Sequence, residues 1–167
     1  MKQIRIILGL ILFFSACTES EKSEIYNENN TTVIDGIVYD IYEKPICGLY
    51  RTYYSDGTIK MEIFSLDGKP HGEGKFYSDK GTLQYKGNFN KGVLNGTLYS
   101  YFDDGQIKDE MHFKNGLKDG VQKIYNKDGN IEIEITFEEG KCITGHKLLN
   151  EQKIELSTDI LDSLSDN

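Results

Sequence analysis

The chain has 167 residues, including 17 glycines, 2 prolines, 11 tyrosines and no tryptophan, and its formal net charge is −8. This length accommodates one modest domain. The acidic balance and the lack of any run of basic residues argue against binding to nucleic acid or to an anionic lipid surface, because both recruit lysine and arginine clusters. The excess of glycine over proline predicts turns that need positive φ, and the tyrosines favour half-exposed strands.

Residues 1–16 combine a positively charged start, a short apolar run and a small-residue exit, the three parts of a secretory signal. The apolar run, Ile6 to Phe14, is too short to cross a bilayer, which needs about 20 residues. A buried N-terminal helix is the alternative, but the polar segment that follows offers nothing for it to pack against. The exit Phe14-Ser15-Ala16-Cys17 resembles a bacterial lipobox, although the first lipobox position is usually Leu. The resemblance implies cleavage before Cys17 and a lipid on that residue, with anchoring to a bacterial membrane in the cell envelope.

Residues 17–32 are polar, rich in glutamate and without an apolar period. They predict a flexible acidic tether between the lipidated cysteine and the folded part. The folded domain is expected to occupy residues 33–150. Its first segment, from Val33 to Gly48, alternates apolar and polar residues and predicts a half-repeat that covers the first edge of a sheet.

A repeat with a period of 24 follows, in four rows that span residues 48–71, 72–95, 96–119 and 120–143. Each row has a tyrosine five residues after its start and glycines nine and twenty residues after it. The tyrosine column contains Tyr53, Tyr77, Tyr101 and Tyr125. The two glycine columns contain Gly57, Gly81, Gly105 and Gly129, and Gly68, Gly92, Gly116 and Gly140. Repetition at a fixed period is typical of stacked repeat architectures.

Between its two inner glycines each row alternates apolar and charged residues, as in Ile59-Lys60-Met61-Glu62-Ile63. A period of two with one apolar face predicts a half-buried strand, and the aromatic segment before the first inner glycine predicts a second one. Each row is therefore expected to form one β-hairpin, with glycine turns at both ends. The predicted fold is all-β: an elongated, twisted meander of antiparallel hairpins. The tyrosine column is expected to stack across the sheet as a ladder.

Residues 151–167 are expected to cap the array. A final strand is predicted near Lys153 to Leu156. Leu156, Ile160 and Leu164 then follow at helical spacing, with Thr158 or Asp159 available as an N-cap, so that a short acidic helix or a frayed tail ends the chain.

The rows resemble the MORN repeat family, specifically the bacterial variant found in proteins labelled YwqK-type antitoxins. The likeness extends over about residues 48–145, and Gly68-Lys69-Pro70-His71-Gly72 is similar to the typical ending of the motif. This resemblance implies a repeat fold with a role in protein or membrane contact and no shared chemistry. The antitoxin label implies a cytoplasmic protein that is the partner of a toxin, and the lipoprotein-like leader of this chain departs from that.

No catalytic, cofactor-binding or metal-binding residue is predicted. The three histidines, His71, His112 and His146, lack a second ligand at metal-site spacing. The segment from Tyr125 to Glu132 resembles part of a calcium loop, but turn chemistry explains its Asn126, Asp128 and Asn130. Carboxylate pairs such as Asp103-Asp104 and Asp109-Glu110 would need a shielded pocket for acid–base work, and an open sheet offers none.

The sequence therefore predicts a non-catalytic cell-envelope lipoprotein that binds an unidentified protein through its repeat surface, with no small-molecule substrate. An antitoxin- or immunity-type protein that neutralises a toxin or effector is the alternative, and an enzyme is the least favoured class. Cys47 and Cys142 are expected not to pair with each other, because eight strands at about 4.8 Å spacing would separate them in an open sheet.

Overall fold

The computed structural model describes Cys17, residues 24–149 and residues 152–165. Within these ranges the chain forms 14 strands and one helix. In chain order they are β1 (Ile25–Asn27), β2 (Thr31–Ile34), β3 (Ile37–Asp40), β4 (Gly48–Tyr53), β5 (Ile59–Leu66), β6 (Lys69–Tyr77), β7 (Leu83–Asn90), β8 (Val93–Tyr101), β9 (Ile107–Lys114), β10 (Leu117–Lys118), β11 (Gly120–Tyr125), β12 (Ile131–Glu138), β13 (Lys141–Leu149), β14 (Gln152–Glu155) and α1 (Thr158–Ser165).

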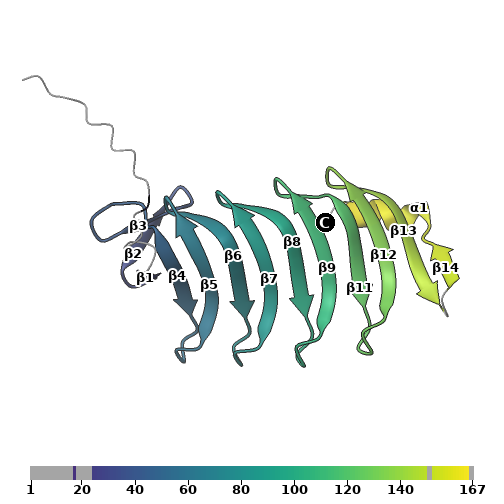
Figure 1. The fold of residues 1–167 in the computed structure, drawn as a ribbon, viewed down its shortest axis with the longest axis horizontal. Coiled ribbons are helices and arrows are strands. Elements are labelled where there is room, and N and C mark those ends of the chain that lie inside the picture. The colour runs from purple at the N-terminus through teal and green to yellow at the C-terminus, as the bar shows by residue number, and fades with distance from the viewer. Residues whose placement is uncertain (1–16, 18–23, 150–151, 166–167) are drawn as a thin grey trace, which may run out of the picture.

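Consecutive hairpins lie edge to edge in one elongated sheet (Figure 1). It has 12 strands in the order β1-β4-β5-β6-β7-β8-β9-β11-β12-β13-β14, with β10 paired to β9. Its neighbouring strands are antiparallel except for β1 and β4, which run parallel. The predicted all-β hairpin array with a short C-terminal helix is confirmed.

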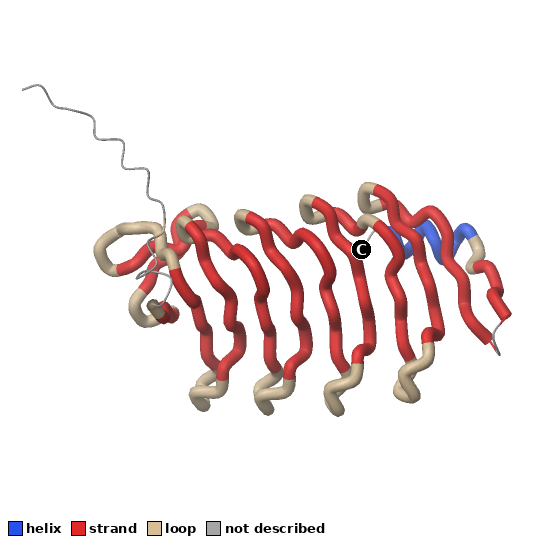
Figure 2. The backbone as a smooth tube through the Cα atoms, in the orientation of Figure 1, coloured by secondary structure: helices blue, strands red, loops and turns tan. Residues whose placement is uncertain are grey.

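Tight loops connect neighbouring strands at both ends of the strands (Figure 2). At one end, each loop follows a tyrosine of the repeat. In the first loop, the Tyr54 N–H donates to the Thr58 carbonyl at 2.8 Å and the Gly57 N–H donates to the Tyr54 carbonyl at 3.0 Å. Gly57 has a φ of +89°, which an L side chain rarely adopts. The same pair of bonds closes the loops that contain Gly81, Gly105 and Gly129.

The loops at the opposite ends of the strands are two-residue turns with positive φ at both positions. In the first, Asp67 has a φ of 52° and Gly68 a φ of 71°. Positive φ at both positions is typical of the type I′ turn, whose twist matches that of the paired strands. The same conformation recurs at Lys91-Gly92, Asn115-Gly116 and Glu139-Gly140.

One backbone hydrogen bond per repeat joins these turns to the strand region before them. The Gly68 N–H donates to the Ile46 carbonyl at 2.8 Å, across almost a whole row of the sequence. The bond recurs from Gly92 to Pro70, from Gly116 to Leu94 and from Gly140 to Lys118, at 2.8 to 2.9 Å. Both the donors and the acceptors are spaced by one row, so the repeat of the sequence is also a repeat of the backbone hydrogen bonds.

Apolar side chains gather on one face of the sheet, which we call the apolar face. Ile63, Ile135 and Phe137 are buried on it, at 2%, 2% and 3% exposure. In its middle, Gly74 of β6 pairs with Gly87 of β7. A Cβ on Gly74 would come within 2.8 Å of Ile63 Cδ1, and one on Gly87 within 2.8 Å of a Leu98 methyl carbon. The two glycines therefore give neighbouring large side chains room to lie over the sheet.

The N-terminal region differs from the predicted tether and half-repeat. β1, which lies within the expected tether of residues 17–32, pairs with β4, and Tyr26 joins the core cluster at 9% exposure. β2 and β3 form a separate two-stranded sheet, which joins the array where the Val38 N–H donates to the Gly68 carbonyl at 2.9 Å. The edge of the array is thus covered by β1 and not by the segment from Val33, and the tether prediction is wrong for residues 24–32. Residues 18–23 lie outside the described ranges.

The C-terminal end contains the expected strand and helix, β14 and α1. The Leu156 N–H donates to the Gly145 carbonyl at 2.8 Å, and the Ser157 carbonyl accepts from the first turn of α1. A Cβ on Gly145 would lie 2.9 Å from methyl carbons of both Leu156 and Leu161. Gly145 therefore lets α1 pack directly against β13, and α1 covers the apolar face at this end of the array.

We expect Gly68→Ala to destabilise the protein more than Gly105→Ala. Both glycines have positive φ, at 71° and 86°, so both variants carry a backbone strain of about 1–2 kcal/mol. A Cβ on Gly68 would also lie 2.5 Å from the Val38 carbonyl oxygen, whereas one on Gly105 meets nothing within 4 Å. Urea denaturation of both variants measures the difference, and equal free energies of unfolding would show that the β2–β3 hairpin does not rest on this turn.

Candidate protein-binding face

The face opposite the apolar face carries a continuous row of charged and polar residues. Each member is the cross-strand partner of the next, from β4 to β14. We call this set the charged row; it contains Arg51, Glu62, Lys75, Lys86, Tyr99, Glu110, Lys123, Glu134, His146 and Glu155. The row arises because strand residues alternate between faces and because antiparallel pairing holds the register from one repeat to the next.

Ion pairs hold the charged side chains at the N-terminal end of this face. Arg51 Nη2 lies 2.6 Å from Glu62 Oε2, and this hydrogen-bonded carboxylate raises the pKa of Arg51. Glu73 accepts from both Lys86, at 2.9 Å, and Lys75, at 3.2 Å. The bond from Lys86, with that from Lys75, lowers the pKa of Glu73. Lys75 and Lys86 lie opposite each other, so Glu73 offsets the repulsion between them.

Similar contacts order the C-terminal half of the face. Lys153 Nζ lies 2.7 Å from Glu134 Oε2, and this bond lowers the pKa of Glu134. The Tyr125 hydroxyl donates to Glu110 Oε2 at 3.1 Å. Burial, with the Glu110 carboxylate, raises the pKa of Tyr125. His112 Nε2 lies 3.5 Å from Glu110 Oε1, and its Nδ1 lies 3.2 Å from Thr97 Oγ1.

The tyrosine column runs along one side of the charged row. Tyr53, Tyr77, Tyr101 and Tyr125 are the last residues of β4, β6, β8 and β11. A shift of the register pairs them with Ile59, Leu83, Ile107 and Ile131, respectively. Such a shift is a β-bulge, and it moves these aliphatic residues out of the apolar row that the alternation of the sequence predicts. The result is a half-exposed stripe in which tyrosine and aliphatic side chains alternate.

The predicted stacking of the tyrosine column is wrong. The tyrosines lie on every second strand, about 9.6 Å apart. Among the described residues, no ring contact joins two tyrosines of the column, whereas Phe76 and Phe89 contact each other with ring centroids 6.3 Å apart. The cross-strand partner of each tyrosine of the column is therefore an aliphatic residue and not another tyrosine.

The other residues that the sequence singles out have local structural partners. Asn126 Oδ1 accepts from the N–H groups of Asp128 and Asn130, both at 3.0 Å, within its turn. Asp104 Oδ1 accepts from the Gln106 N–H at 3.0 Å. The described part of the chain contains no group of three or more His, Cys, Asp or Glu side chains that could hold a metal ion. It also contains no helix that is long and apolar enough to span a membrane.

Cys47, His71, Asn95 and Asp119 occupy one column of the repeat, which precedes a glycine in each row. Asn95 Oδ1 accepts from the Asn115 N–H at 3.1 Å, and Asp119 Oδ2 accepts from the Glu139 N–H at 3.4 Å. Both bonds fasten the following type I′ turn. His71 Nδ1 is buried and lacks such a partner. The first member, Cys47, departs from this pattern.

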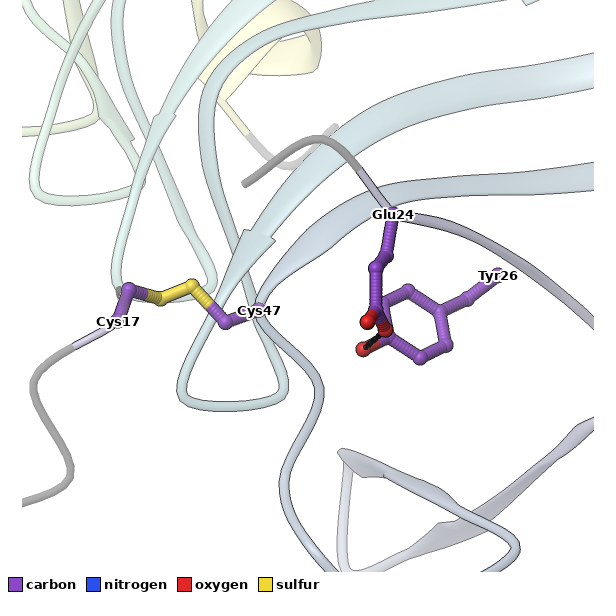
Figure 3. The surroundings of a disulfide bond; sticks show 4 residues. All are labelled: Cys17, Glu24, Tyr26 and Cys47. Atoms are coloured by element: carbon purple, nitrogen blue, oxygen red, sulfur yellow. Dashed lines mark hydrogen bonds between the residues drawn. A yellow bond between two sulfur atoms is a disulfide. The ribbon is translucent and has the colours of Figure 1, made fainter. Parts of the chain in front are cut away.

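Cys47 forms a disulfide with Cys17, and the two Cα atoms lie 5.8 Å apart (Figure 3). The prediction that Cys47 and Cys142 do not pair with each other is confirmed. Sequence reasoning missed the Cys17–Cys47 pair because it assigned the Cys17 sulfur to a lipid. The position of Cys47 in a column of otherwise polar residues was the available signal that this side chain has a special role.

Fold and surface together define a β-hairpin repeat protein with one capped apolar face and one polar face. The sequence pattern of the MORN repeat variant matches residues 46–67, 70–91, 94–115 and 118–139. These segments make up 88 of the 167 residues, and the chain belongs to the MORN repeat variant family. The matched segments have the same period as the predicted rows and begin two residues earlier.

No curated protein matches the chain. Among solved structures it is similar to a chain of the Glycosylation Associate Protein (Gap123) complex from Streptococcus agalactiae, with 13% identity, a TM-score of 0.44, and coverage of 87% of this chain and 26% of that one. It is also similar to a chain of the accessory secretory protein 1, 2 and 3 structure from Streptococcus pneumoniae, with 13% identity, a TM-score of 0.39, and coverage of 75% and 21%. The chain thus spans about a quarter or less of these proteins.

We expect His71→Asn to stabilise the protein. An asparagine at this position can accept from the N–H of the following turn, as Asn95 does at 3.1 Å. One hydrogen bond of this kind contributes about 0.5–1.5 kcal/mol. Asn95→Ala is the matched control and is expected to lose a similar amount. Urea denaturation at pH 7 measures both; a destabilised His71→Asn protein would mean that His71 has a role in packing that the column does not show.

We expect Lys153→Met to weaken the dependence of stability on acid pH. The folded-state pKa of Glu134 is lowered from its ordinary value of 4.5, so its bond to Lys153 stabilises the protein above that pH. This contribution is lost as the pH falls through the folded-state pKa. Lys153 is 58% exposed, so the effect is below about 1 kcal/mol. The loss of unfolding free energy between pH 7 and pH 3 should be smaller in Lys153→Met than in Lys80→Met, which changes an exposed turn lysine. Equal losses would contradict the assignment.

Proposed function

We propose that this protein is a non-catalytic module of the bacterial cell envelope that binds a partner protein through its polar face, the face of the charged row and the tyrosine column. The observation that carries the proposal is the difference between the two faces of the sheet. The apolar face is covered at one end by the N-terminal strands and at the other by α1, and Ile63, Ile135 and Phe137 are buried on it. The polar face carries half-exposed tyrosines beside charges that are already ordered by ion pairs.

The chemistry of the polar face suits a protein partner. Tyrosine and arginine are enriched at protein interfaces, because they combine apolar contact area with polar groups. Side chains that are ordered before binding lose less conformational entropy on association. Glu73, held by two lysines, and Glu110, held by Tyr125, are ordered in this way. The sheet also presents one tyrosine of the column at each repeat, which favours an extended partner surface.

The position at a membrane is part of the proposal and is supported by the sequence of residues 1–17. In the anchored form Cys17 carries the lipid. Seven peptide units separate Cys17 from Glu24, where the continuous described chain begins. At about 3.5 Å per residue they reach at most about 25 Å. The array would therefore lie close to the bilayer, and the long tether predicted from the sequence is not needed.

Site-specific photo-cross-linking in cells tests the use of the polar face. Lys86 and Tyr85 are adjacent in β7 and therefore point to opposite faces, and Tyr85 is 47% exposed on the apolar side. A photoreactive residue at Lys86 or Lys123 should give the same cross-linked protein, whereas one at Tyr85 should not. Equal or stronger cross-linking from Tyr85 would contradict the assignment of the face.

The identity of the cross-linked protein decides between the two forms of the proposal. A toxin or effector whose activity is lost in the complex would make this chain an immunity-type protein. A structural envelope protein would make it a scaffold. Both outcomes keep the binding role, while a purified chain that turns over the captured protein would contradict a non-catalytic module.

A further inference from the structure

Two different covalent bonds, a disulfide and a thioether to a lipid, would each use the sulfur of Cys17. In the structure it forms a disulfide with Cys47, at a Cα–Cα distance of 5.8 Å, which lies in the usual range for disulfide-bonded cysteines. A lipid linked to this residue through a thioether would need the same sulfur. One Cys17 side chain can therefore carry the lipid or the disulfide, but not both.

The fold brings Cys17 back to Cys47 through the strand that follows it. β1 pairs with β4 in parallel, with Ile25 opposite Leu49, and the Leu49 N–H donates to the Glu24 carbonyl at 2.9 Å. Tyr26 fixes β1 in the core cluster, and its hydroxyl donates to the Glu24 carboxylate (Figure 3). β4 begins at Gly48, directly after Cys47, so docking of β1 returns the N-terminal segment to the neighbourhood of Cys47.

Cys47 is almost fully buried. It is 6% exposed and follows Ile46, which is 1% exposed. Cys142, the remaining cysteine after the leader, lies on β13, eight places from β4 in the strand order of the sheet. The protein's own N-terminal segment is therefore the thiol source that the fold presents to Cys47.

We propose that Cys47 controls anchoring by competing with lipid for the Cys17 sulfur. Docking of β1 before acylation leads to the disulfide and, once the Ala16–Cys17 peptide bond is hydrolysed and the leader leaves, to an exported, unanchored form. Acylation before docking leads to the anchored form with Cys47 as a thiol. The inference rests on the lipid anchor of the proposed function. It extends that proposal, because it assigns Cys47 to the choice between two locations of the chain.

The disulfide forms when the two thiols lose two electrons and two protons to an external disulfide, such as that of an oxidised thiol–disulfide oxidoreductase of the exported compartment, which is reduced to a dithiol. The thioether forms when Cys17 Sγ bonds to a glyceryl carbon of a phospholipid, while the thiol proton and the phosphate-bearing headgroup leave. The second reaction involves no net oxidation.

The test uses the full chain in cells that are fed an alkyne-labelled fatty acid, followed by separation of membrane and soluble fractions. Cys47→Ser should shift the chain from the soluble to the membrane fraction and raise its labelled share. Cys142→Ser is the matched control and should leave the distribution unchanged. Cys17→Ser should lose the label. Non-reducing peptide mapping of the soluble wild-type protein should detect Cys17 joined to Cys47.

Two results would overturn the inference without affecting the binding face. One is an unchanged labelled share in Cys47→Ser while Cys17→Ser loses the label, which would leave the anchor without the competition. The other is a soluble wild-type protein without the Cys17–Cys47 peptide, a measurement that does not depend on the folding of any variant. Absence of label from both the wild-type and Cys47→Ser proteins would remove the anchor and the inference together.

Discussion

The array depends on the backbone hydrogen bond that joins each type I′ turn to the strand region before it. A flat sheet of hairpins would leave the donors of these turns to water, but here Gly68, Gly92, Gly116 and Gly140 each bond to a carbonyl almost one row upstream. The bond involves no side chain, so the sequence between two such glycines can vary while the geometry of the repeat is kept. Positive φ at the turn is the local condition for it, which explains the glycine column.

The two faces of the sheet follow from this regular register. Since the pairing is held from repeat to repeat, alternate residues collect into an apolar face and a charged row that cross the whole array. Different elements cover the two ends of the apolar face. β1 and the β2–β3 hairpin lie at one end, and α1 packs over Gly145 at the other. Terminal units of a repeat array are expected to differ from the inner ones, because each has only one neighbour. The opposite face carries the charged row and the tyrosine column along the whole array.

The inner repeats could be predicted from the sequence, because their pattern is carried by residues with specific backbone requirements. Glycines at a fixed period and clean alternation were sufficient for the hairpins, their order and their turns. The ends could not be predicted in the same way. β1 is three residues long and is held by pairing with β4 and by burial of Tyr26, which are non-local effects that leave no period in the sequence. The bulge beside each tyrosine was missed because strict alternation places Ile59 with Met61, whereas the register pairs it with Tyr53.

Amide hydrogen exchange by NMR tests the repeat bond most directly. If the turns are tied to the strand region before them, the N–H groups of Gly68, Gly92, Gly116 and Gly140 exchange slowly, as part of the cooperative unit of the sheet. The two inner donors, Gly92 and Gly116, should be the most protected of the four, since they have repeats on both sides. Exchange of Gly92 and Gly116 at the rate of an unstructured peptide would contradict the account, because the hairpins would then be held together by strand pairing alone.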